Sequence, residues 1–450
     1  MTVKKHLGLQ RAFWVFAQIF VGTAIRIFKN YHCKITRPKS RVFLALYNHT
    51  DDLDPLYMAI CLFRHMRYVA SSVILQGFAG KVISFLLGPI PRPKAASADE
   101  TVELMLENLR AGISVGMSAE GNRSWDGETM YISPRTAEVA KRSGAGLVTY
   151  RTRGGYLRTP RFAANKRKGP VFGEMVREYS AEELARMSVE EISAAIAKDL
   201  YVNAYQDQTD PPEIIRDYLK KRKGQNSFSG NATNESIAVN QVTGAIRYKG
   251  KAKAENIESI LFICPECKGI GTLSSCGDEF YCTCGIKGIV NDYGFLEGQL
   301  PFHNTVDWNH WQKAYLKEHA EGLKGDETPI FEDHGADVYI TTNNEKKLVS
   351  QEADVLFYPE HLEVRSANGK CEVPINEDRK DLSREAGEET ADMNDTRTFP
   401  LASIAKFGAF RSRKIFFQSA EAYCELSFDH IVSGMKYEAF WRVLTGREYY

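Results

Sequence analysis

The sequence has almost no net charge. Its 58 Lys and Arg residues balance 57 Asp and Glu residues, which leaves +1 at pH 7. A chain with this balance has no global positive field that would attract nucleic acid. Nucleic acid is therefore not an expected partner. Hydrophobic residues make up 43% and charged residues 26% of the chain, as in soluble globular proteins.

The cysteine pattern lacks the features of a disulfide framework. Five of the nine cysteines lie between Cys264 and Cys284, and the rest are scattered at Cys33, Cys61, Cys371 and Cys424. Small disulfide-rich domains instead distribute an even number of cysteines along a short secreted chain. The pattern predicts a reducing compartment and one metal site.

A long uninterrupted hydrophobic run is missing as well. The most apolar stretch, residues 12–28, is broken by Gln18 and Arg26. As a helix it would measure about 25 Å, which is short of a hydrocarbon core of about 30 Å. With Trp14 at the headgroup boundary, we predict a membrane-interfacial helix within residues 1–38, on the cytoplasmic face of a membrane. A core helix, a transmembrane span and a signal peptide are the alternatives, although no convincing small-residue cleavage site follows.

Strand-like and helix-like patterns alternate between residues 40 and 200. Apolar runs predict strands, and amphipathic stretches between them predict helices. The expected strands cover residues 42–47, 68–73, 113–117 and 146–151, and the expected helices cover 56–65, 78–87, 101–112 and 133–144. Such alternation is typical of βαβ units. We therefore predict an α/β fold with a mixed, largely parallel sheet flanked by helices.

The length of 450 residues predicts two to four domains. The α/β domain is expected at 39–220, followed by a polar linker at 221–258 and a small cysteine-rich domain at 259–297. Short β patterns and a last helix predict a β-rich domain at 330–450, with a charged, disordered insert near 376–397. This last region resembles pleckstrin-homology-like or GRAM-like domains, which implies lipid or protein docking.

The stretch ALYNHTDDLDP, residues 45–55, changes abruptly from an apolar strand to polar residues. Asn and Asp favour turns, and we interpret Asp51 and Asp52 as turn or cap residues. The remaining pair, His49 and Asp54, is suited to catalysis, because a carboxylate fixes the tautomer of a histidine and stabilises its imidazolium. No nucleophilic Ser or Cys motif is evident, so the proton would come from a substrate hydroxyl.

Two further segments carry residues suited to phosphate. SAEGNRSWDG, residues 118–127, follows a predicted strand, where the site of an α/β protein is expected. Its Glu120-Gly121 pair allows close approach of the backbone, and Arg123 can fork onto a phosphate. The segment GPIPRPK supplies Arg92 after another apolar stretch.

These segments resemble the 1-acylglycerol-3-phosphate acyltransferase family, a broad group of lysophospholipid and glycerolipid acyltransferases. NHTDDLD is similar to the family's N-H-x4-D motif at Asn48, His49 and Asp54. GPIPRP resembles its second block, AEGNRS resembles its E-G-T-R-S block, and GLVTYRTRGGY lies where the family has a fourth block. The resemblance covers about residues 1–215.

The resemblance implies a role for each matched residue. His49 would deprotonate the acceptor hydroxyl, which then attacks an acyl thioester, and Asp54 would orient His49. The acceptor site, with arginines on its phosphate, would contain Asn48, Arg92, Glu120, Gly121, Arg123 and Ser124. The expected donor is acyl-CoA or acyl carrier protein, the expected acceptor is 1-acylglycerol-3-phosphate, and no catalytic cofactor is expected. An inactive membrane-binding adaptor and a thioesterase-like activity are the alternatives, and the intact pair favours the enzyme.

The chain departs from the family pattern at a few positions near the acceptor site. Ala119 replaces the usual proline, Asn122 replaces the threonine, and Thr149-Tyr150 replaces proline-valine. These changes leave the catalytic pair intact but bear on the choice of acceptor. The basic run at residues 150–170 either binds headgroup or carrier phosphates or forms a solvated basic face.

The segment CPECKGIGTLSSCGDEFYCTCG places Cys264-x2-Cys267 before Cys282-x-Cys284. Two such knuckles predict a zinc ribbon, in which four thiolates bind structural Zn²⁺ and the metal supplies folding energy. The second knuckle is one residue shorter than usual, so Cys276 is a competing ligand, and reduced thiols without metal are the alternative. A catalytic zinc is not expected, because protein ligands fill every position.

Overall fold

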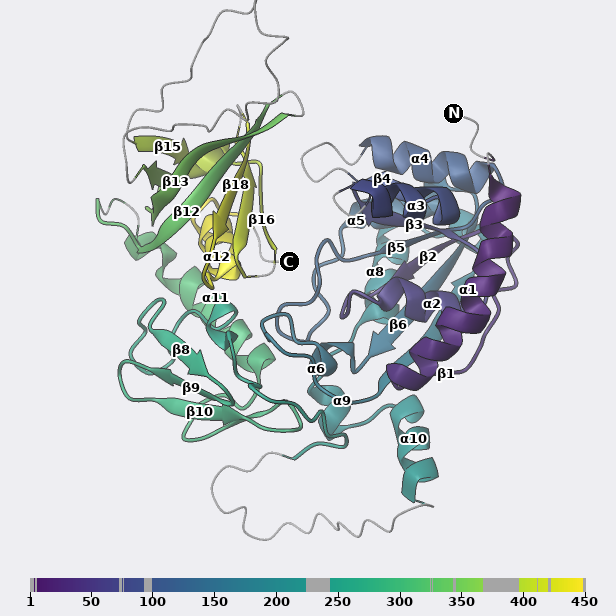
Figure 1. Cartoon of the computed structure of the whole chain (residues 1–450), viewed down its shortest axis with the longest axis horizontal. Coiled ribbons are helices and arrows are strands. Elements are labelled where there is room, and N and C mark those ends of the chain that lie inside the picture. Colours follow the sequence, from purple (N-terminus) through teal and green to yellow (C-terminus); the bar gives the residue numbers. More distant parts are fainter. Residues whose placement is uncertain are drawn as a thin grey trace, which may run out of the picture.

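The computed structural model describes residues 4, 6–72, 75, 77–92, 99–223, 243–323, 325, 327–342, 345–366, 396–410, 412–419 and 422–447. Half of the predicted linker and nearly all of the predicted insert near 376–397 lie outside the described residues. Figure 1 shows an α/β domain on the right, a small β domain at the lower left and a larger β domain at the upper left.

The first domain is built on a seven-stranded sheet. Its strands are β1 (Tyr31–Cys33), β2 (Phe43–Tyr47), β3 (Arg67–Ser71), β4 (Ile90–Arg92), β5 (Val115–Ser118), β6 (Gly146–Arg153) and β7 (Val171–Tyr179). They lie in the order β1-β7-β6-β2-β5-β3-β4, and every neighbouring pair is parallel except β6 and β7. The predicted mixed, largely parallel sheet is confirmed.

Helices cover both faces of this sheet (Figure 1). The helices of this domain are α1 (Leu7–Phe28), α2 (Asp54–Leu62), α3 (Gly77–Leu87), α4 (Asp99–Arg110), α5 (Pro134–Arg142), α6 (Gly155–Arg158), α7 (Ala181–Arg186), α8 (Val189–Leu200), α9 (Gln206–Thr209) and α10 (Glu213–Lys223). Side chains of β2 alternate between the faces: Leu44 and Leu46 pack with α4, α5 and α8, whereas Phe43 and Ala45 pack with α2. A strand buried on both sides is apolar throughout, which is why it was recognisable.

The predicted strands and helices of this domain are present, with ends shifted by a few residues. The sequence patterns missed three strands, β1, β4 and β7. The longest of them, β7, runs antiparallel to β6 and continues the sheet toward β1. It follows the basic run at 150–170, whose charges obscured the apolar pattern that begins at Val171.

The N-terminal helix α1 is longer than its apolar segment suggested. It spans 22 residues, or about 33 Å, so length does not exclude a membrane span. By length and composition it is apolar enough to cross a membrane, yet only 11% of its most apolar window is buried. Its buried residues are Gln10, Gly22 and Ile25. This exposure argues against the alternative of a core helix.

The cysteine-rich segment forms a small antiparallel sheet in the order β11-β10-β9-β8. Its elements are the short helix η1 (Ile257–Ser259) and the strands β8 (Leu273–Cys276), β9 (Glu279–Cys282), β10 (Lys287–Val290) and β11 (Leu296–Glu297). Helix α11 (Thr305–Leu323) then leads from this sheet to the C-terminal domain (Figure 1).

The C-terminal domain is a seven-stranded antiparallel sheet closed by a helix. Its elements are β12 (Phe331–Thr342), β13 (Glu345–Phe357), β14 (His361–Arg365), β15 (Thr396–Pro400), η2 (Leu401–Ser403), β16 (Lys406–Phe410), β17 (Lys414–Gln418), β18 (Tyr423–Phe428) and α12 (Gly434–Leu444). The order is β15-β14-β13-β12-β18-β17-β16. The predicted β-rich C-terminal region is confirmed, and its likeness to pleckstrin-homology or GRAM domains stays a prediction.

One hydrophobic cluster joins the three parts of the chain. It contains Tyr156 from the first domain, Phe280 from the cysteine-rich sheet, Trp308 from α11 and Phe440 from α12. Because these side chains share one core, the first domain is held by the elements that follow it.

Candidate active site

The predicted catalytic pair lies where β2 ends and α2 begins. His49 Nδ1 is 3.1 Å from Asp54 Oδ2. The His49 side chain is 24% exposed, whereas that of Asp54 is fully buried. With the Nδ1 proton donated to the carboxylate, Nε2 is left as the acceptor. Within the described part of the chain, no protein group binds Nε2, so it is free to take a proton from a substrate.

The Asp54 carboxylate is fixed by the turn that precedes it. Oδ2 accepts hydrogen bonds from the backbone N–H groups of Thr50 and Asp51, at 2.6 and 2.8 Å. Asp54 also lies in the first turn of α2, where the helix dipole favours a negative charge. Asp51 accepts from Leu53 N–H at 3.1 Å, as expected of a turn residue. The turn and the predicted catalytic pair therefore belong to the same short segment, residues 49–54.

Glu120 lies behind His49 rather than on the open side of the site. Its two carboxylate oxygens accept the backbone N–H groups of His49, at 2.5 Å, and of Met130, at 2.6 Å. The residue is 3% exposed, and burial raises the pKa of Glu120 to about 8, although the two N–H donors act to lower it. Ser124 N–H donates to His49 O at 2.8 Å. The loop after β5 thus holds the His49 backbone at both its N–H and its carbonyl.

Arg123 is held at the edge of the site by two contacts. Nη1 lies 3.3 Å from Asp52 Oδ1, and Nη2 donates to Thr159 O at 2.7 Å. The Arg123 side chain is 17% exposed, and that of Asp52 is 60% exposed. Gly121 is exposed, and a Cβ there would meet nothing within 4 Å. The open space beside this loop leaves room for a ligand.

The other predicted acceptor residues divide into buried and exposed groups. Asn48 is fully buried and joins β2 to β6, because its amide donates to Thr152 O and accepts from Thr152 N–H. Ser124 is also buried, and its hydroxyl donates to Glu128 O at 2.7 Å. Arg92, at the end of β4, is exposed. The structure therefore leaves Arg92, Gly121 and Arg123 accessible to a ligand.

Elements outside the first domain support the loop after β5. Thr305 of α11 donates to Asp126 O at 2.6 Å, and Asn309 donates to the Asp126 carboxylate. His310 Nε2 lies 2.6 Å from Glu128 Oε2. No sequence pattern predicts these contacts, because α11 lies about 180 positions after the loop that it binds.

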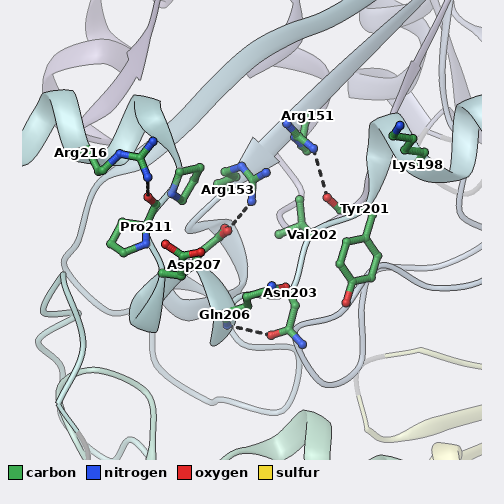
Figure 2. Close-up of a pocket in the computed structure, with 12 residues that line it drawn as sticks. Arg151, Arg153, Lys198, Tyr201, Val202, Asn203, Gln206, Asp207, Pro211 and Arg216 are labelled. Atoms are coloured by element: carbon green, nitrogen blue, oxygen red, sulfur yellow. Dashed lines mark hydrogen bonds and ion pairs between the residues drawn. The ribbon is translucent and has the colours of Figure 1, made fainter.

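The arginines of the basic run at 150–170 bind other parts of the protein. Arg153 forms an ion pair with Asp207, and Arg151 binds Glu174 at 2.9 Å. Arg167 is 3% exposed and donates to Lys253 O at 2.8 Å. Figure 2 shows Arg151 and Arg153 in a hollow of about 240 Å³ whose lining includes none of the predicted site residues. These arginines therefore stabilise the protein itself, which differs from both predicted roles, phosphate binding and a solvated basic face.

The four predicted metal ligands come together at the end of the small sheet. The Sγ atoms of Cys264, Cys267, Cys282 and Cys284 lie within 4.8 Å of one another. Cys264 to Cys284 and Cys267 to Cys282 are each 3.7 Å apart. A tetrahedron with Zn–S bonds of 2.3 Å has S–S edges of about 3.8 Å, so the spacing fits zinc. Cys276 is not in the group, and the cluster can hold a metal ion without it.

Residues 30–153 match the protein-family model described as Acyltransferase. No curated protein matches the sequence. Among solved structures, the 1-acyl-sn-glycerophosphate (LPA) acyltransferase PlsC from Thermotoga maritima is similar, with 16% identity over 44% of this chain and 78% of that chain and a TM-score of 0.36. The matched range contains His49, Asp54, Arg92 and the loop after β5. The match therefore assigns an acyltransferase domain to this part of the chain.

Proposed function

We propose that the chain transfers a fatty acyl group from acyl-CoA or acyl carrier protein to the hydroxyl of 1-acylglycerol-3-phosphate, which yields phosphatidic acid. The observation that carries this proposal is the His49–Asp54 contact of 3.1 Å, made inside the range that matches the Acyltransferase family model. The ring is partly exposed while its carboxylate is buried, which suits a general base with a fixed tautomer.

In the proposed reaction, His49 Nε2 takes the proton of the acceptor hydroxyl. The hydroxyl oxygen then attacks the thioester carbonyl, and a tetrahedral intermediate forms. When the C–S bond breaks, the imidazolium returns the proton to the leaving thiolate. Asp54 stabilises the imidazolium throughout, because its buried carboxylate stays within 3.1 Å of Nδ1.

Binding of the acceptor is assigned to the exposed residues of the site. Arg92 and Arg123 would bind its phosphate, since a guanidinium matches phosphate oxygens in pairs. Gly121 would let the acceptor approach the backbone. Asn48 and Glu120 would act through the backbone of the site, because their side chains are buried and bind main-chain groups.

We further propose that the protein works on a membrane surface. Large apolar side chains are exposed on α1 and on the neighbouring α3, namely Leu9, Val15, Phe16, Ile19, Phe20, Val21, Ile27, Phe28, Phe78, Val82, Phe85 and Leu87. Helices of this kind insert their apolar faces into the headgroup region of a bilayer. The four-cysteine cluster would hold structural Zn²⁺, with no catalytic role.

The test is acyl transfer by the purified chain on liposomes, with wild type compared with His49→Ala. Acyl-CoA and acyl carrier protein donors would be offered with a panel of lysolipids that includes lysophosphatidate. Loss of a general base is expected to lower the rate by about 10²–10⁴-fold. His334→Ala is the matched control, because His334 forms another His–Asp contact, 2.8 Å from Asp354, on the exposed surface of the C-terminal domain.

Each outcome bears on a different part of the proposal. Full activity of His49→Ala would overturn the role of His49 as the base. Transfer only to other lysolipids would keep the mechanism and replace the acceptor, which would direct attention to Ala119 and Asn122. No transfer by wild type, with liposome binding intact, would favour the membrane-binding adaptor.

A further inference from the structure

The short segment that follows α6, residues 159–161, holds Arg123 from two directions. Thr159 O accepts from Arg123 Nη2, and Arg161 Nη1 donates to Arg123 O, both at 2.7 Å. The Thr159 hydroxyl donates to Asp51 Oδ2 at 3.1 Å, in the turn before α2. The segment therefore contacts the side chain and the backbone of Arg123, and it also contacts the turn that contains the predicted catalytic pair.

The other end of the Arg161 guanidinium is bound by the C-terminal domain. Nη2 donates to Ala409 O of β16 at 3.0 Å. The guanidinium also lies over the Trp125 ring, 3.3 Å from its centroid. In Figure 1, β16 is on the side of the C-terminal sheet that faces the first domain. One side chain therefore links β16 to the loop that carries Arg123.

Arg161 is not available to a substrate. Its terminal nitrogens bind backbone carbonyls, and within the part of the chain that the structure describes no carboxylate forms an ion pair with it. Burial lowers the pKa of Arg161 to about 9, with repulsion from Arg123 as the next cause, so the group is still charged at pH 7. Hydrogen bonds from a charged donor are stronger than those between neutral groups. Arg161 therefore acts as a fixed link.

The Ala409 carbonyl is itself held by packing inside the C-terminal domain. Ala409 is buried, and it pairs with Ile415 of the neighbouring strand β17. Its side chain lies against Gly434, the first residue of α12, where an added Cβ would be 2.2 Å from Ala409 Cβ. Because carbon atoms cannot approach so closely, any larger residue at this position would shift β16 or α12. The position of the carbonyl that binds Arg161 therefore depends on how β16 packs on α12.

The alternative is that Arg161 only attaches the C-terminal domain to the first domain. That role does not require contact with a site residue, whereas residues 159–161 bind Arg123 at both its carbonyl and its guanidinium. A side chain that is ordered before its ligand arrives loses less conformational entropy on binding. The contacts therefore favour a role in ordering Arg123.

We propose that Arg161 is a positioning residue through which β16 of the C-terminal domain holds Arg123 in place for the phosphate of the acceptor. The inference rests on the proposed function and deepens it. It makes acceptor binding depend on Arg161 and Ala409, which both lie outside the range that matches the Acyltransferase family model.

The experiment measures binding of glycerol 3-phosphate, a soluble form of the phosphate end of the acceptor, by titration calorimetry with the full chain. Wild type would be compared with Arg123→Ala and Arg161→Lys. Lysine keeps the charge, but its single nitrogen cannot span two carbonyls as the fork of a guanidinium does. Arg167→Lys is the matched control, because Arg167 is another buried arginine of the same basic run and donates to Lys253 O instead.

Variants of the C-terminal domain test the other end of the link. Gly434→Ala would displace Ala409 without any change in the first domain. Gly408→Ala is its control, because Gly408 is the residue before Ala409 on β16 and a Cβ there would meet nothing within 4 Å. Ala409→Gly combined with Gly434→Ala is the rescue, because it removes the methyl group that the new side chain would meet and keeps the carbonyl that binds Arg161.

We expect Arg123→Ala, Arg161→Lys and Gly434→Ala each to weaken the binding of glycerol 3-phosphate at least fivefold. Arg161→Lys combined with Gly434→Ala should stay within about twofold of Arg161→Lys alone, because both changes break the same link. Arg167→Lys, Gly408→Ala and the rescue should stay within about twofold of wild type. In steady-state kinetics, Arg161→Lys should raise the KM for the acceptor and leave kcat and the KM for the acyl donor within about twofold, a split that loss of folded protein would not produce.

Thermal unfolding would verify that each variant is folded. The inference is wrong if a folded Arg161→Lys chain changes the dissociation constant by less than twofold, or if wild type binds glycerol 3-phosphate no better than Arg123→Ala. If Arg161→Lys does not fold, Gly434→Ala and its rescue decide the question. Weaker binding in Arg161→Lys with unchanged binding in Gly434→Ala would overturn the role of β16.

Failure of the proposed function would look different. A wild-type chain that transfers no acyl group, but binds glycerol 3-phosphate in a way that depends on Arg123, Arg161 and Gly434, would overturn the proposed reaction and keep the link. Acyl transfer that is lost in His49→Ala, with an unchanged KM for the acceptor in Arg161→Lys, would keep the reaction and overturn the link.

Discussion

At the scale of single residues, Glu120 presents a conflict between burial and hydrogen bonding. Its oxygens accept two backbone N–H groups, which favours the charged form, yet burial raises the pKa of Glu120 to about 8. A folded-state pKa above the ordinary value of 4.5 means that the folded chain binds this proton more tightly than the unfolded chain. The contribution of Glu120 to stability is therefore greatest below pH 4.5 and is lost as the pH rises through about 8.

Glu120→Gln tests this balance. The Gln amide nitrogen cannot accept from a backbone N–H, so we expect the free energy of unfolding to fall by about 1–3 kcal/mol at pH 5. Only wild type carries the Glu120 proton, whose contribution to stability is lost between pH 5 and pH 9, so the difference between the two proteins should become smaller at pH 9. Urea unfolding at both pH values measures it, with Glu138→Gln on the exposed face of α5 as the control. A difference that grows with pH would mean that the N–H donors outweigh burial.

At the scale of elements, α1 contributes Ile25 to the core of the first domain but leaves most of its apolar side chains exposed. Phe16 and Phe20 are 54% and 59% exposed, so their replacement should leave the fold intact. Burying one such side chain is worth about 1.5–3 kcal/mol, and 1.4 kcal/mol is a factor of ten in affinity. We expect the double variant Phe16→Asn/Phe20→Asn to bind phosphatidylglycerol vesicles at least tenfold more weakly in sedimentation. Ile289→Asn, an exposed apolar residue on β10, is the control, and unchanged vesicle binding by the α1 variant would contradict the membrane role of α1.

At the scale of the whole molecule, the cysteine cluster is connected to the candidate active site through α11. Trp308 of α11 donates to Ile263 O at 3.0 Å next to Cys264, and Thr305 at the start of the same helix donates to Asp126 O. Loss of the proposed zinc should therefore destabilise the small sheet and also the loop that holds Arg123. We expect Cys267→Ser to lose about one bound zinc per chain, to unfold at lower temperature and to transfer acyl groups more slowly.

The measurements are zinc content, thermal unfolding and acyl transfer on the same preparations. Cys276→Ser is the matched control, because Cys276 is an exposed cysteine of the same sheet that lies outside the cluster. Equal loss of zinc in the two variants would show that Cys276 is a ligand. Loss of zinc without any change in acyl transfer would show that the metal does not support the loop after β5.

Features that depend on neighbours in the sequence were predictable. His49 and Asp54 are joined by one turn, and each cysteine knuckle is a short local loop, so residue type and spacing were sufficient for both. Strand β2 was recognisable because it is buried on both faces. The start of α1 and the strand β7 were not predictable, because the residues around them are polar or charged. Only packing decides whether such residues form a helix or a strand.

Residues close together in the chain specify the α/β class, the contact between His49 and Asp54 and the four clustered thiols. Packing between distant segments places Glu120 behind His49, brings α11 to the loop after β5 and sets Ala409 of β16 against Arg161. The last contact joins residues 248 positions apart, through a backbone carbonyl that has no sequence signature. Hydrogen bonds of this kind are set by how whole domains pack, and no local pattern carries that information.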